Sequence, residues 1–169
     1  LANIKEAMPG SVAAKKKYKV LCFSKPYGFP HSSIKTAKKM IQGMGDKTGM
    51  FTVDFSDDAK DLSAANLAKY DALYLNNTTK MEKGITDPLK RKELVDFVKN
   101  GGGLFAVHAA TDGGWPEYVK MTGGDFDGHP WGHEGTYCLC NEDPTHPIVA
   151  NIFNGEQRTV QVSPATYYQ

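Results

Sequence analysis

Short apolar segments alternate with amphipathic segments along the first two thirds of the chain. Four segments are apolar or alternate as strands do, and polar or turn-forming residues bound each of them: residues 18–24, 51–55, 71–76 and 104–107. Between them, apolar residues recur at three- and four-residue steps. This spacing predicts helices from Ser32 or Ser33 through Met44, over residues 62–70, and after the N-cap Asp87 with Pro88 in its first turn.

The order strand, helix, strand, helix, strand, helix, strand indicates an α/β protein with a doubly wound, mostly parallel sheet and helices on both faces. Beyond residue 108 the pattern predicts a short helix over residues 116–121 and strands over 135–140 and 159–162. Residues 1–17 show no clear periodicity and are interpreted as a lead-in or linker. Residues 18–169 are predicted to form a single domain.

Composition narrows the function classes. The chain has 169 residues and a formal net charge of +1, which gives no basic footprint for nucleic acid. A mean hydropathy of −0.45 and the lack of a long apolar stretch predict no membrane span. Three cysteines are an odd number, so a disulfide framework does not hold the fold together. Oligomeric state and localisation stay open; a cytoplasmic location and, for a processed or excised fragment, export both fit.

Polar residues gather in the loops that follow the predicted strands. His31 follows the first strand, Asn77 and Thr78 follow the third, and His108 and Asp112 follow the fourth. In doubly wound sheets, ligands bind in the crevice beyond the carboxyl ends of the strands. Imidazoles, amides, hydroxyls and a carboxylate suit a small ligand with many hydroxyl groups, so the sequence predicts a sugar ligand.

The later loop region holds further candidates. Trp115 and Trp131 are predicted either to stack on sugar faces, as substrate-binding residues, or to cover the edge of the sheet. His129 and His133 have the spacing of a helical metal pair, but Pro130 between them does not suit a regular helix. The sequence therefore requires no cofactor, and a divalent metal stays an alternative.

Several motifs together resemble one family. The segments KVLCFSKPYGFPHSSI, LAKYDALYLNNTT, GGGLFAVHAATD and FDGHP follow one another between Lys19 and Pro147. In this respect the chain is similar to the trehalose-utilisation (ThuA-like) family. The resemblance implies a flavodoxin-like fold related to the class I glutamine amidotransferases, in which a cysteine nucleophile sits on the sharp turn after a strand. His108 stands at the equivalent turn, and an imidazole does not form the acyl-enzyme of a cysteine-dependent glutaminase.

The resemblance implies a carbohydrate-processing enzyme, of the kind described as a glycosyl hydrolase or keto-sugar-processing enzyme, that acts on a disaccharide or an oxidised sugar derivative. The family's recurrent polar positions correspond to His31, Thr78, His108, Asp112 and His129. His108 is predicted to be the general acid or base, with His31 and His129 beside it. Asp112 would orient an imidazole, and Asn77 and Thr78 would hold substrate hydroxyls.

One departure from the family keeps alternatives open. Members carry an acidic pair shortly before a tyrosine late in the domain, and the segment that ends Tyr167-Tyr168-Gln169 lacks it. We therefore expect a domain that is truncated at its C-terminal end. The alternatives to an enzyme of this family are a non-catalytic carbohydrate-binding or interaction module of a larger protein and a histidine-ligated metal hydrolase.

Overall fold

The computed structural model describes residues 16–128, 137–148, 150, 156 and 159–162. Contacts divide the chain into two compact units at Phe126 and Asp127, and each unit is described by itself. The single domain expected over residues 18–169 therefore stays a prediction. None of the helices in the described part of the chain is both long and apolar enough to cross a membrane.

A parallel sheet forms the centre of the first unit. Its strands are β1 (Tyr18–Phe23), β2 (Phe51–Ser56), β3 (Ala72–Asn76) and β4 (Gly103–Val107). The spatial order is β2-β1-β3-β4 and every neighbouring pair is parallel. The chain first moves outward from β1 to β2 and then returns past β1 to β3, so the strand order reverses between β1 and β3. This confirms the predicted flavodoxin-like α/β fold.

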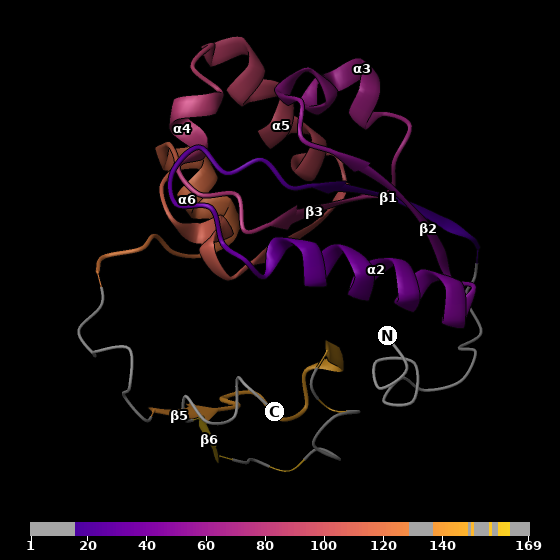
Figure 1. Ribbon diagram of the computed structural model, residues 1–169, viewed down its shortest axis with the longest axis vertical. Coiled ribbons are helices and arrows are strands. Elements are labelled where there is room, and N and C mark those ends of the chain that lie inside the picture. Colours follow the sequence, from indigo (N-terminus) through magenta and orange to yellow (C-terminus); the bar gives the residue numbers. More distant parts are fainter. Residues whose placement is uncertain (1–15, 129–136, 149, 151–155, 157–158, 163–169) are drawn as a thin grey trace. The chain divides into compact units, whose positions relative to one another are not determined.

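Helices cover both faces of this sheet (Figure 1). Alternate residues of a strand point to opposite faces, and the two core clusters follow this rule. Leu21 and Phe23 of β1 pack with leucines of the helical segments on one face, whereas Cys22 packs with Ile41 of α2 (Ile34–Thr48) on the other. The first face is covered by η1 (Ala59–Leu62), α3 (Ala64–Leu67), α5 (Pro88–Lys99) and α6 (Pro116–Thr122).

The helix after β1 is longer than the sequence predicted. It continues through Gly43 and Gly45 to Thr48, and Gly49 ends it with a left-handed φ of 66°. A Cβ atom at Gly45 would lie 2.8 Å from the carbonyl oxygen of Phe51, so this glycine lets β2 approach the helix closely. Tertiary packing thus outweighs the low helix propensity of glycine.

The segment between β2 and β3 differs from its prediction. Within residues 62–70, where a longer helix was predicted, the structure has the single turn α3, and a separate single turn, η1, precedes it and ends at Leu62. The side chain of Asp58 caps η1 by accepting a hydrogen bond from the Lys60 N–H. The helix predicted after Asp87 is confirmed as α5, with Asp87 accepting from the Leu89 N–H and Pro88 in the first turn. The short helix α4 (Met81–Gly84) had no clear sequence signal.

The second unit holds an antiparallel pair of strands. Its strands are β5 (Tyr137–Cys140) and β6 (Thr159–Val162), with Tyr137 opposite Val162 and Cys140 opposite Thr159. Both strands were predicted; residues 135 and 136, which the prediction included in the first of them, lie outside the described residues. His129 and Trp131, predicted as site residues, lie outside the described residues.

Candidate functional site

Buried polar side chains mark one end of the sheet. In the part of the chain that the structure describes, the buried residues with polar side chains are Ser24, Asn76, Asn77, Thr78 and Thr79. Ser24 directly follows β1, and the other four form the end of β3 and the loop after it. Burying polar groups costs free energy unless they are hydrogen-bonded, so their concentration indicates a built site. It lies at the carboxyl ends of the two strands between which the strand order reverses.

Thr79 holds the loop after β1 against the loop after β3. Its hydroxyl accepts a hydrogen bond from the Gly28 N–H at 3.0 Å and donates one to the Phe29 carbonyl at 3.2 Å. The Tyr27 N–H also donates to the Thr79 carbonyl, at 2.8 Å. These contacts fix the loop that carries His31 relative to β3.

His108 occupies a strained backbone position directly after β4. Its φ is +52°, in the left-handed region that non-glycine residues rarely adopt. The described non-glycine residues with positive φ are this histidine, Asn77 (54°) and Lys80 (55°), and all three lie in the loops after β3 and β4. Strain of this kind persists where surrounding contacts enforce it, and it concentrates at functional sites. The sharp turn predicted at His108 is therefore present.

Asn77 contacts the His108 ring. The Nδ1 atom of His108 lies 2.8 Å from the Oδ1 atom of Asn77. Asn77 is only 2% exposed, and its Nδ2 atom donates to Asn76 Oδ1 at 2.9 Å. His108 itself is exposed, so one edge of its ring is fixed by a buried amide while the rest of the residue reaches solvent. Such an arrangement suits a proton-transferring group or a ligand donor.

His31 packs edge-to-face against His108. The ring centroids of the two histidines lie 4.6 Å apart with an interplanar angle of 83°. The Phe29 ring packs against His31, with the ring centroids 5.0 Å apart. Partial burial lowers the pKa of His31 below its usual value; the positive charge of a protonated His108 lowers it further, and Asp112 opposes the shift. His31 is therefore neutral at neutral pH. The structure brings the two predicted histidines together.

Asp112 pairs with a lysine that the sequence analysis did not single out. Its Oδ1 atom lies 2.8 Å from Lys80 Nζ, and its backbone carbonyl accepts from the Lys80 N–H at 2.6 Å. The hydrogen bond that the Lys80 ammonium group donates to the Asp112 carboxylate raises the pKa of Lys80. The contact that orients an imidazole, which we expected from Asp112, is made by Asn77 at His108. The position of Lys80 directly after the Asn-Asn-Thr-Thr run was the available signal.

Two further predicted binding residues in the described part of the chain, Thr78 and Trp115, are buried. Thr78 is fully buried, so its hydroxyl does not face solvent. Trp115 is 5% exposed and belongs to the core, where its ring packs against Tyr118 at 5.0 Å and the Arg91 guanidinium lies 5.2 Å from the ring centroid. This placement agrees with a covering role and gives no support to stacking on a sugar. The described residues include no group of three or more histidines, cysteines and carboxylates that could hold a metal ion.

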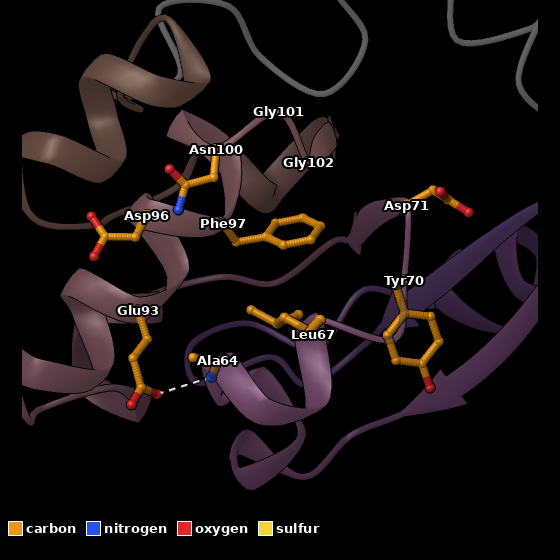
Figure 2. Close-up of a pocket in the computed structure, with 11 residues that line it drawn as sticks. Ala64, Leu67, Tyr70, Asp71, Glu93, Asp96, Phe97, Asn100, Gly101 and Gly102 are labelled. Atoms are coloured by element: carbon orange, nitrogen blue, oxygen red, sulfur yellow. Dashed lines mark hydrogen bonds between the residues drawn. The ribbon is translucent and has the colours of Figure 1, made fainter.

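A pocket of about 520 Å³ lies at the opposite end of the sheet, where β3 and β4 begin (Figure 2). Residues before β3 and β4 line it together with Leu67 of α3 and Phe97 of α5. Each carboxylate at its rim is paired with a lysine: Asp71 with Lys16, Glu93 with Lys90, and Asp96 with Lys92. Because these carboxylates are already paired with lysines of the same chain, the pocket is a weaker candidate for binding a polar ligand than the histidine site.

The fold and the site define a flavodoxin-like α/β protein with a histidine pair at the switch point of its sheet. Residues 19–162 match the ThuA family, described as trehalose utilisation, and the chain belongs to this family. No curated protein matches the chain. A crystal structure of a ThuA-like protein from Bacteroides uniformis has a similar fold, with a TM-score of 0.69 and 19% sequence identity. The match covers 93% of this chain and 62% of that protein's chain.

Proposed function

We propose that this chain carries the sugar site of a carbohydrate-processing enzyme that acts on a disaccharide or an oxidised derivative of one. The observation that carries the proposal is the His108–Asn77 contact beside His31, at the carboxyl ends of the central strands. The family description, trehalose utilisation, supports a disaccharide as the substrate class. His108 would act as the general acid or base, because it is exposed and its imidazole is oriented by the contact of Nδ1 with Asn77.

His31 supplies a neutral partner in this proposal. Its lowered pKa keeps it uncharged at neutral pH, so its ring does not place a positive charge beside His108. Phe29 packs against His31 and is itself 68% exposed, which gives the site an accessible aromatic face. Exposed aromatic rings suit the apolar faces of sugars.

The first unit offers no reactive cysteine that could act as the nucleophile of a glutaminase. The described cysteine of this unit, Cys22, is fully buried in the core. Burial raises the pKa of its thiol, which keeps it protonated and poorly nucleophilic. The residue at the turn after β4 is His108, so acid–base chemistry is the better-supported class of reaction.

The binding part of the proposal is tested by titrating the full chain with trehalose, and separately with a keto derivative of trehalose, while backbone amide resonances are followed. We expect the largest shifts around His31, Asn77 and His108. Shifts confined to Leu67, Phe97 and their neighbours would place the ligand in the second pocket and overturn the assignment. Product analysis of the same samples distinguishes an enzyme from a non-catalytic sugar-binding module, since binding without turnover favours the module.

A further inference from the structure

A chain of buried hydrogen bonds leads from the first turn of α2 to the His108 ring. The Nδ2 atom of Asn76 lies 3.1 Å from the Ile34 carbonyl oxygen and 3.2 Å from Ser24 Oγ. A carbonyl oxygen only accepts hydrogen bonds, so the nitrogen of the Asn76 amide must face Ile34. The Oδ1 atom of Asn76 therefore faces the other way, toward Asn77, from which it accepts at 2.9 Å.

The same logic continues to the imidazole. Because Asn77 donates through Nδ2 to Asn76, its Oδ1 atom is the one that faces His108 Nδ1, at 2.8 Å. An amide oxygen has no hydrogen to give, so His108 Nδ1 carries the hydrogen of this bond. A neutral imidazole has a single N–H group, which leaves the lone pair on Nε2.

Reversing this pattern is costly because no solvent reaches the two amides. Asn76 is 0% exposed and Asn77 is 2% exposed. Turning the Asn77 amide alone would bring its oxygen against Asn76 Oδ1. Turning both amides would bring Asn76 Oδ1 against the Ile34 carbonyl oxygen. Each arrangement leaves two buried acceptors facing each other, which costs roughly 1–3 kcal/mol for each unsatisfied group.

We propose that Asn76 is a positioning residue that fixes the tautomer of His108 through Asn77, and that neutral His108 accepts a proton or hydrogen bond at Nε2. The proposal rests on the proposed function for its catalytic meaning. It specifies that the substrate presents a hydroxyl or another acidic hydrogen to Nε2. The Nδ1–H group stays bound to Asn77.

The test is nitrogen NMR of the full chain with labelled histidine, which shows which ring nitrogen of neutral His108 carries hydrogen. We expect Nδ1–H in the wild type. Asn76→Leu should give a mixture of both tautomers, because Asn77 then loses the acceptor that fixes its amide. Asn76→Asp should retain Nδ1–H, because one oxygen of its carboxyl group still accepts from Asn77 while the other, protonated at this buried position, donates to the Ile34 carbonyl. Tyr74→Phe is the matched control: it removes a buried hydroxyl from the same strand, outside the hydrogen-bonded chain, and should leave the tautomer unchanged.

Wild-type His108 with hydrogen on Nε2, or Asn76→Leu with Nδ1–H fully retained, would overturn the proposal. If Asn76→Leu does not fold, Asn77→Ala removes the acceptor directly and should give the same mixture. The NMR experiment needs no substrate, so it tests the positioning role of Asn76 even if the proposed function is wrong. In turnover assays, Asn76→Leu should lower kcat by roughly tenfold and leave KM nearly unchanged.

Discussion

The Nδ1 atom of His108 and the Oδ1 atom of Asn77 lie 2.8 Å apart, although the residues are separated by 31 positions in the sequence. They meet because β3 and β4 are adjacent and parallel, with Asn76 in register with Val107. Each residue directly follows one of these partners, so both side chains stand at the same edge of the sheet. Both also have positive φ values, 54° for Asn77 and 52° for His108.

We predict that Asn77→Ala lowers the free energy of unfolding by about 2–4 kcal/mol. The change leaves Asn76 Oδ1 without its donor, and alanine tolerates a positive φ poorly. Urea unfolding measures the loss. Asn77→Gly is the matched control, since it removes the same side chain without the backbone strain, and it should be more stable than Asn77→Ala by about 1 kcal/mol. Equal stability of the two variants would contradict a strained backbone at residue 77.

Two glycines should respond in opposite directions to the same substitution. A Cβ atom at Gly84 would lie 2.0 Å from the Cζ atom of Tyr27, whereas one at Gly43 would meet nothing within 4 Å. Gly84→Ala should therefore destabilise the protein by about 1–3 kcal/mol and displace the loop that carries His31. Gly43→Ala, inside α2, should stabilise it by about 0.5–1 kcal/mol.

Urea unfolding of both glycine variants checks this pair. Amide shifts of the Tyr27–His31 loop report the displacement, which only Gly84→Ala should cause. A neutral effect of Gly84→Ala on stability and on these shifts would contradict the close packing of α4 against Tyr27.

The pH dependence of stability should carry a contribution from His31. Its pKa lies below the ordinary value of 6.5 in the folded protein, because burial and the neighbouring His108 disfavour its charged form. As the pH falls below 6.5, the unfolded chain takes up this proton more readily, so the free energy of unfolding decreases. Above 6.5 both states are largely neutral at this residue and the penalty disappears.

Urea unfolding of the wild type and of His31→Gln, above and below pH 6.5, measures this contribution. The variant should lose less stability on acidification than the wild type, because glutamine does not titrate. An identical loss in both proteins would show that His31 titrates as it does in the unfolded chain.

The sequence predicted the sheet because each central strand is a short apolar run bounded by polar residues. Leu21 and Phe23 on one face and Cys22 on the other show why: the strand is buried on both sides, so apolar residues do not alternate with polar ones. The length of α2 was missed because the space needed at Gly45 depends on Phe51, which no local pattern contains.

Part of the candidate site could also be predicted from the sequence. His31, Asn77 and His108 follow apolar strands, and parallel strands bring their carboxyl ends to one edge. The sequence could not predict which of these groups contact each other, because the contacts depend on side-chain geometry. Asp112 is bound to Lys80, and Asn77 takes the position beside His108. Trp115 was expected at the sheet edge or on a sugar, and its burial against Tyr118 required knowledge of the packing of α6.

The most direct test of the account is turnover of trehalose, or of its keto derivative, by the full chain with His108→Ala. His146→Ala is the control: the Nδ1 atom of His146 accepts a local hydrogen bond from the Ile148 N–H at 3.2 Å, and this variant should keep wild-type activity. If His108 is the general acid or base, His108→Ala should lower kcat by roughly 10²- to 10⁴-fold in protein whose amide spectrum shows that it is folded. Full turnover by His108→Ala on a substrate that the wild type processes would contradict the account.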